Sequence, residues 1–154
     1  MEGLTPEAHF EGRSRHTLDE KGRLAIPARF REVLNQKGDT SLVVTNLNNC
    51  LVAFAMGDWR SRIKEKAVNL PLFDNAATTY LRYFVSGAVE CPLKQNRILI
   101  PPDLRNLAGL NKEVVLVGSL TRFEIWDKLR WEEEFERVKE TFPEASQSLT
   151  DLGI

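Results

Sequence analysis

The sequence predicts an α+β fold built from two tandem copies of one β-β-α-β-β unit, with peripheral helices. The main observation is an internal repeat, in which residues 23–31 (RLAIPARFR) return 74 positions later as residues 97–105 (RILIPPDLR). Short strand-like runs accompany each copy in the same order. A unit of about 45 residues is too small to bury a stable core alone. We therefore expect hairpins from the two copies to interleave in a pseudo-twofold β-barrel.

Local signals place the elements of the first unit. Two strands are expected near residues 13–18 and 23–26, joined as a hairpin by a tight turn. Pro27 fixes the backbone for the first turn of a helix over residues 28–34. The other expected strands are residues 41–45 and 50–54, around a turn at residues 46–49, with counterparts at residues 115–118 and 122–126.

Three aspartates are expected to cap the helices that follow the two units. They are Asp58 for a helix to about Val68, Asp74 for one to about Phe84, and Asp127 for one to about Glu140. Pro143 should stop the last helix and leave residues 144–154 as a mobile tail. The resulting division is a first repeat at residues 10–59, connecting helices at 60–84, a second repeat at 85–131, and a C-terminal helix and tail at 132–154.

Composition favours a cytoplasmic globular protein. Of 154 residues, 42% are hydrophobic and 28% charged, no apolar run is long enough to span a bilayer, and residues 1–7 lack the pattern of a secretion signal. Cys50 and Cys91 are far apart and outside any C-x-x-C motif. We therefore expect two buried thiols, with neither a disulfide framework nor a zinc site.

Charge is unevenly distributed along the chain. The net charge is -1, but residues 132–154 hold seven acids against two bases, so residues 1–131 carry +4. Residues 10–31 hold only three acids against six bases, namely Arg13, Arg15, Lys21, Arg23, Arg29 and Arg31. A local basic surface of this kind can bind phosphate although the whole chain is slightly acidic.

The segment from Asp19 to Arg23 has the chemistry of a rigid basic turn. The Asp19 carboxylate can accept hydrogen bonds from turn amides, and Gly22 can adopt the positive φ that a compact turn needs. Arg23 would then be held where its guanidinium reaches a guanine edge or a phosphate. Lys21 at the tip suits phosphate. Taken alone, Asp19 and Arg23 would equally fit a surface salt bridge.

Residues 18–31 (LDEKGRLAIPARFR) resemble the signature of the SpoVT/AbrB swapped-hairpin superfamily. The tandem copies, together with residues 10–13 (FEGR), 87–91 (GAVEC) and 123–127 (FEIWD), resemble the MraZ family over about residues 10–140. This resemblance implies a swapped-hairpin DNA-binding regulator that catalyses nothing and needs no cofactor. It also implies a ring-shaped, nucleoid-associated homo-oligomer that contacts short guanine-containing direct repeats at the promoter of the division and cell-wall gene cluster.

The resemblance makes double-stranded DNA the expected partner of the basic hairpin. Arg13 and Arg15 share one face of their strand and extend the same surface. Arg29 and Arg31 lie on the short helix that follows, and Arg31 could instead brace the barrel by pairing with an acid. The predicted DNA site of the first repeat is Arg13, Arg15, Asp19, Lys21, Gly22, Arg23, Arg29 and Arg31.

The second turn, at residues 93–97 (LKQNR), departs from this pattern. It is one residue shorter, has no aspartate, and places Asn96 where the first repeat has Gly22. Asn tolerates positive φ, so a turn remains possible. Lys94 and Arg97 are expected to touch phosphate, with Arg97 pointing differently from Arg23 and the first repeat dominating recognition. The alternative is a second hairpin that serves only the barrel and the oligomer.

Other motifs give little support to an enzyme. Nucleotide-binding loops and nucleophile elbows are absent, and His9 and His16 lack metal-ligand spacing. Two rival functions are an antitoxin-like module that binds DNA and protein, and a purely structural ring. A further basic run contains Arg60, Arg62, Lys64 and Lys66. It is typical of a solvated helix, or of one that meets the acidic helix of a neighbouring subunit.

Overall fold

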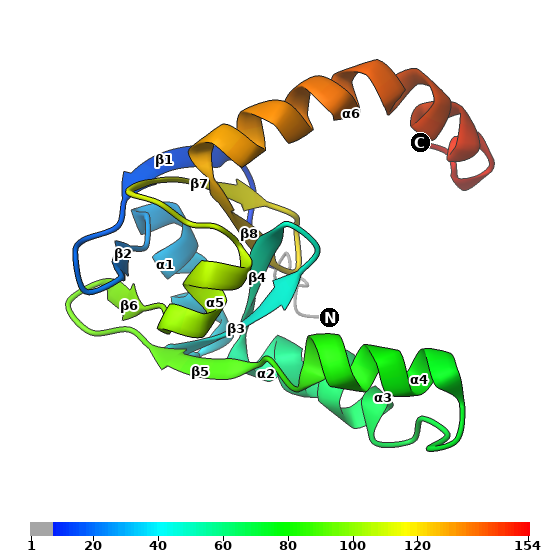
Figure 1. The fold of residues 1–154 in the computed structure, drawn as a ribbon, viewed down its shortest axis with the longest axis horizontal. Coiled ribbons are helices and arrows are strands. Elements are labelled where there is room, and N and C mark those ends of the chain that lie inside the picture. Colours follow the sequence, from blue (N-terminus) through cyan, green and yellow to red (C-terminus); the bar gives the residue numbers. More distant parts are fainter. Residues whose placement is uncertain (1–7) are drawn as a thin grey trace, which may run out of the picture.

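The computed structural model describes residues 8–154; residues 1–7, the basis of the expectation about a secretion signal, lie outside the described part. Its strands form a six-stranded antiparallel sheet in the order β1-β7-β8-β4-β3-β5 and a two-stranded sheet of β2 and β6 (Figure 1). The strands are β1 (Arg13–Thr17), β2 (Arg23–Ala25), β3 (Ser41–Leu47), β4 (Cys50–Ala55), β5 (Val89–Pro92), β6 (Arg97–Leu99), β7 (Glu113–Gly118) and β8 (Phe123–Asp127).

Strands of the two repeats pair with each other. β1 pairs with β7 in a register that places Arg13 opposite Val117, and β5 pairs with β3. β2 pairs with β6, with Leu24 opposite Ile98. The expectation that the first two strands of each repeat form a ribbon together is therefore wrong. Each repeat is too small to cover its own strands, and the other repeat supplies the partners.

One apolar core fills the space between the two sheets. Leu24 and Ile98 are almost fully buried and lie opposite each other in the small sheet. Phe10, Phe30 and Phe123 form an aromatic cluster, with the Phe10 ring centroid 5.2 Å from that of Phe30 and 5.1 Å from that of Phe123. Each repeat contributes side chains to this core, so unfolding of one repeat would expose the apolar side chains of the other.

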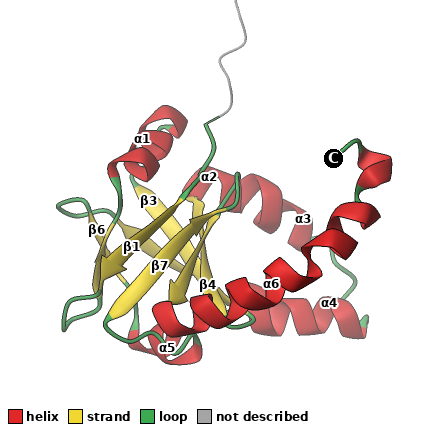
Figure 2. Cartoon of the chain, turned by 90° about the horizontal axis from the view of Figure 1, so that it is seen from above, coloured by secondary structure: helices red, strands yellow, loops and turns green. Residues whose placement is uncertain are grey.

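The helices lie around these sheets, with α1 and α5 at opposite ends (Figure 2). They are α1 (Ala28–Lys37), α2 (Met56–Asp58) continuing through the π-helix η1 (Trp59–Lys64) into α3 (Glu65–Ala67), α4 (Asn75–Tyr80) continuing into the π-helix η2 (Leu81–Val85), α5 (Pro102–Leu107), α6 (Lys128–Ser148) and the 3₁₀ helix η3 (Thr150–Leu152). The helices over residues 56–85 cover a second apolar cluster on the sheet, which includes Phe54, Trp59 and Phe84.

Two of the three expected caps are confirmed. The Asp74 carboxylate accepts from the Ala77 amide at 2.9 Å, and the Asp127 carboxylate accepts from the Leu129 amide at 3.2 Å. Asp58 is not a cap, because the helix already begins at Met56 and Asp58 has helical backbone angles. Its carboxylate instead pairs with the Lys37 ammonium at 3.1 Å. Asp58 thus joins this helical segment to α1 through an ion pair.

The expected stop at Pro143 is also wrong. α6 continues through Pro143 to Ser148, and residues 150–152 form η3 where a mobile tail was predicted. Proline cannot donate an amide hydrogen bond to the carbonyl of Lys139, and its ring crowds that carbonyl. The helix nevertheless continues, so Pro143 disturbs α6 without ending it. α6 therefore has a long half that extends beyond the sheet (Figure 1).

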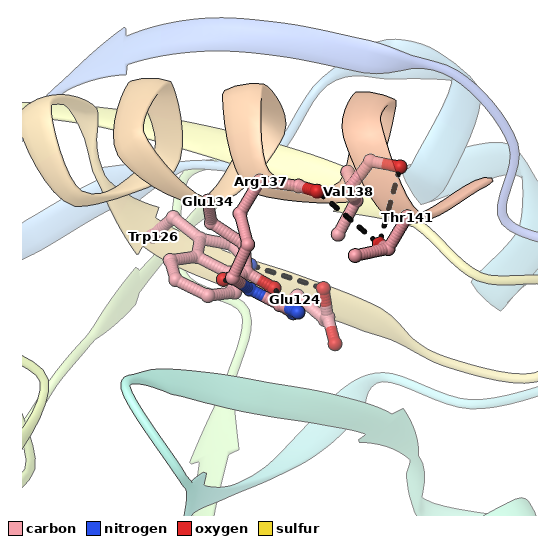
Figure 3. A network of polar contacts seen from close by, with 6 residues as sticks. All are labelled: Glu124, Trp126, Glu134, Arg137, Val138 and Thr141. Atoms are coloured by element: carbon pink, nitrogen blue, oxygen red, sulfur yellow. Dashed lines mark hydrogen bonds and ion pairs between the residues drawn. The ribbon is translucent and has the colours of Figure 1, made fainter.

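The first half of α6 is anchored on the sheet by Trp131. Its ring centroid lies 5.7 Å from that of Trp126 on β8. The Trp126 indole donates to Glu124 at 3.0 Å, and Arg137 makes a two-point contact with Glu134 on the helix itself (Figure 3). That contact lowers the pKa of Glu134. Of these contacts, the packing of Trp131 on Trp126 is the one that joins α6 to the sheet.

Candidate nucleic-acid interface

Two turns lie together beside the β2–β6 sheet, on the left of Figure 1. In the first, the Asp19 amide donates to the Arg23 carbonyl at 3.1 Å and the Gly22 amide to the Asp19 carbonyl at 3.0 Å. In the second, Lys94 and Arg97 exchange both backbone bonds around Gln95 and Asn96, which have φ of 53° and 64°. Two successive residues at positive φ are typical of a type I′ hairpin turn. The shorter second tip and the positive φ of Asn96 are therefore confirmed.

The Asp19 carboxylate organises the first turn. Its Oδ1 accepts from the amides of Lys21 at 3.0 Å and Arg23 at 2.8 Å, and its Oδ2 accepts from the Arg23 Nε at 2.5 Å. The Arg23 amide, helped by the Arg23 guanidinium and the Lys21 amide, lowers the pKa of Asp19 against a smaller opposing effect of desolvation. The guanidinium of Arg23 is thus oriented at its Nε side, while 42% of the side chain stays exposed.

Asp19 also reaches the second turn. Nη1 of Arg97 lies 3.6 Å from Asp19 Oδ2, the same oxygen that binds Arg23. The second turn has no acid of its own, yet its arginine faces the acid of the first. Since β2 and β6 are antiparallel neighbours, Arg23 and Arg97 lie at diagonal corners of one small sheet. One carboxylate therefore lies between two guanidinium groups from different repeats.

Gly22 fits this site for two reasons. Its φ is +89°, which a residue with a side chain rarely adopts, so the predicted positive φ is confirmed. A Cβ at this position would also lie 2.6 Å from the Nε of Arg105. The Arg105 side chain packs over the turn and donates to the Ile100 carbonyl at 3.0 Å. The first turn therefore packs against the Arg105 side chain on α5 of the second repeat.

The other predicted site residues are placed at increasing distance from the turns. Lys21 and Lys94 are exposed on the turns themselves. Arg15 lies midway along β1, and Arg13 at its far end lies over the Phe135 ring of α6, 4.7 Å from the centroid. Arg29 packs against Gly12, which precedes β1 at the end away from Asp19. The structure thus gathers five predicted residues with Gly22 at the turns and leaves Arg13 and Arg29 elsewhere.

The family model described as "MraZ protein, putative antitoxin-like" matches this chain twice, over residues 9–83 and 84–152. Relatives named "Transcriptional regulator MraZ" are similar over nearly their whole length. Those of Halothermothrix orenii and Moorella thermoacetica are 40% and 42% identical over 146 residues, which is 94% of this chain and 99% of each relative. That of a Thermoanaerobacter species is 42% identical over 144 residues, 93% of this chain and 98% of its own.

The chain belongs to the MraZ family. Its two matches meet between residues 83 and 84, so each match holds one basic turn and one proline-led helix. The shared Asp19 is thus a contact between the two MraZ repeats.

Arg31 and Arg105 occupy equivalent positions in the two MraZ repeats and make equivalent hydrogen bonds. The Arg31 Nε donates to the Ile26 carbonyl at 3.1 Å, as the Arg105 Nε does to Ile100. Arg31 thus stabilises the end of the strand by a hydrogen bond to a backbone carbonyl. The alternative expectation was that it would pair with an acid. Arg105 was not predicted, although the 74-residue offset from Arg31 gave the signal.

Other chemistry has little support in residues 8–154. Within them, no group of three potential metal-ligating side chains converges, and none of the helices has the length and apolarity to cross a membrane. Cys50 and Cys91 are buried free thiols, as predicted. Burial raises the pKa of Cys50 to about 12 and that of Cys91 to about 11, so both thiols stay protonated and poorly nucleophilic at neutral pH.

The support of Gly22 by Arg105 can be measured with a matched glycine. Gly38 also has positive φ (+74°), but nothing lies within 4 Å of a Cβ built there. We expect Gly38→Ala to lower the free energy of unfolding by about 1 kcal/mol, the cost of the backbone conformation alone. Gly22→Ala should cost more, because its Cβ also meets Arg105. Urea unfolding at equal protein concentration gives both values, and equal losses would contradict the close contact.

The titration of Asp19 tests the geometry of its turn. We expect its carboxyl to titrate below the ordinary value of about 3.9 in an NMR titration. Because the folded pKa is lowered, its stabilisation is complete above that ordinary value and is lost only as the pH falls through the folded pKa. Arg23→Ala should raise the pKa partway, since the amide of residue 23 remains. A midpoint at or above 3.9 in the unsubstituted chain would contradict the hydrogen bonds.

Proposed function

We propose that this chain is a sequence-specific DNA-binding transcriptional regulator that contacts double-stranded DNA with its two adjoining basic turns. The observation that carries the proposal is the Asp19 carboxylate, which holds Arg23 at 2.5 Å and faces Arg97 at 3.6 Å. The name of the MraZ relatives, "Transcriptional regulator MraZ", supports the same function.

The geometry supports base reading by Arg23. Asp19 binds its Nε, so the terminal nitrogens on the outer side are available to acceptors beyond the protein. Two parallel N–H donors match the N7 and O6 acceptors of guanine in the major groove. Orienting the guanidinium in advance lowers the entropy cost of that contact. Arg97 is less tightly held, which suits a phosphate or a weaker base contact.

Lysines at the two tips support backbone contacts. Lys21 and Lys94 project from neighbouring turns as exposed point charges, which bind phosphates without selecting sequence. Arg15 extends this positive surface along β1. Arg13, Arg29 and Arg31 have partners within the fold, and we assign them a supporting place at the edge of the interface.

The finer features of the proposal follow the family resemblance. They are guanine-containing direct repeats at the promoter of the division and cell-wall gene cluster, a ring-shaped homo-oligomer, a swapped-hairpin barrel, a location in the cytoplasm at the nucleoid, and the absence of catalysis. The pairing of β2 with β6 and of β1 with β7 supports the barrel. One pair of turns offers few phosphate contacts, so several subunits on repeated sites would gain affinity through effective concentration.

Arg23 and Lys21 should differ in what they contribute to binding. On a DNA fragment from upstream of the chain's own gene, we expect Arg23→Ala to cost about 1–3 kcal/mol and to relax preference at one base pair. Lys21→Ala should weaken all sequences similarly and reduce the slope of log affinity against log salt by about 1. Arg82→Ala, which removes an exposed base on η2 outside the proposed interface, is the control and should change little. Unchanged affinity and base preference in Arg23→Ala would overturn the assignment, and no preference for specific DNA in the unsubstituted chain would favour a structural ring.

The two turns should contribute unequally. Arg23 has a close Nε contact with Asp19 and Arg97 a longer one, so Arg97→Ala should lose less affinity than Arg23→Ala on the same DNA. Asp19→Ala removes the acid from both arginines and should change preference at the positions read by each. Fluorescence anisotropy titrations with base-substituted DNA give these comparisons. A larger loss from Arg97→Ala, with both variants folded and of the same mass, would contradict the dominance of the first turn.

A further inference from the structure

α6 carries an apolar stripe that is longer than the surface it covers. Its positions alternate in steps of four and three residues, which is the heptad pattern of a helix that packs against other helices. On α6 they are Trp131, Phe135, Val138, Phe142 and Ala145, and the same spacing continues to Leu149 at the helix end and Leu152 in η3. Trp131 packs on Trp126, and Phe135 lies against Arg13 and Trp131. The barrel thus covers only the first part of this stripe.

The rest of the stripe is exposed. Phe142 is 65% exposed and Leu152 71%, although both continue the seam that begins on the barrel. A solvated helix end needs no large apolar residues at regular heptad positions, so this half of α6 has the pattern of a docking surface.

A second exposed apolar surface lies on the helical arm, residues 56–85. A groove runs between its helices and is lined by Ile63, Lys66, Ala67, Leu70, Ala77 and Tyr80. At the tip beside it, Phe73 is fully exposed and Leu72 is 77% exposed. Figure 1 shows α6 and this arm both extending to the right of the sheets, with α6 above and the arm below.

Charge decides which surface the exposed half of α6 fits. Residues 132–154 carry a net charge of -5, so two α6 helices would repel each other. The arm (residues 56–85) holds five bases against three acids, a net charge of +2, with Lys64 and Lys66 exposed. The apolar stripe of α6 and the apolar groove of the arm therefore have opposite charges around them, as complementary interfaces do.

We propose that residues 138–152, which form the distal half of α6 and η3, dock in the arm groove of a second copy of this chain. The contact joins two different surfaces of the chain. In an open assembly one end copy has a free α6 and the other a free groove, and both are filled when the assembly closes on itself. It rests on the homo-oligomer included in the proposed function and names the surfaces that form it. The basic turns lie on another part of the barrel and remain available to DNA.

Sedimentation velocity tests this contact with one substitution on each surface. Phe142→Ser removes the central exposed residue of the stripe, and Ala76→Glu adds bulk and negative charge to an exposed position that lines the groove. Each variant should sediment as a monomer at concentrations where the unsubstituted chain is oligomeric. The matched controls, Gln147→Ser off the stripe and Asn75→Glu outside the groove lining, should retain the oligomer.

Mixing the two defective variants gives the decisive result. A Phe142→Ser copy still has an intact groove and an Ala76→Glu copy an intact α6, so one good contact remains and the mixture should form dimers that grow no further. Oligomers of unchanged mass in both single variants, or a mixture that stays monomeric, would overturn the docking. A monomeric unsubstituted chain would overturn the homo-oligomer as well. Binding of Phe142→Ser to a single DNA site should match that of the unsubstituted chain, so failure of DNA recognition would be seen separately.

Discussion

The pairing of β2 with β6 is the constraint on which the rest of the structure depends. These strands are only three residues long, and each is the second strand of its repeat. Reciprocal backbone bonds continue their pairing, from the Ile26 amide to the Asn96 carbonyl at 3.0 Å and from the Ile100 amide to the Gly22 carbonyl at 2.9 Å. The two basic turns are thus hydrogen-bonded to the opposite repeat. A small sheet that the core requires also determines where the turns lie.

This arrangement explains how an irregular second turn can still contribute to one surface. The first turn has Asp19 and a glycine, and the second has neither, yet both are held by the same sheet. Asp19 faces arginines from both sides, so a single carboxylate serves two repeats. The two turns can therefore differ in sequence, because Asp19 of one repeat acts across the interface on Arg97 of the other.

The sequence was a good guide to whatever depends on neighbouring residues. The repeat, the order of elements, the positive φ of Gly22 and the caps Asp74 and Asp127 are local properties, and they were predicted. Contacts between distant segments were not. The pairing of β1 with β7, the ion pair that occupies Asp58 and the approach of Arg97 to Asp19 depend on tertiary packing, which no short window of sequence contains. The predicted helix end at Pro143 was wrong because a proline disfavours a helix locally without always ending it.

The exchange of strands between repeats also has a consequence for how the chain folds. β1 leaves the ribosome well before its partner β7, which lies at Glu113–Gly118. The first repeat therefore emerges with an unpaired edge strand and cannot complete its sheet until most of the second has been synthesised. Such long-range pairing slows folding, because a large loop must close before its contacts form. During that interval the open edge of β1 is exposed to non-native pairing, which is an aggregation hazard for the nascent chain.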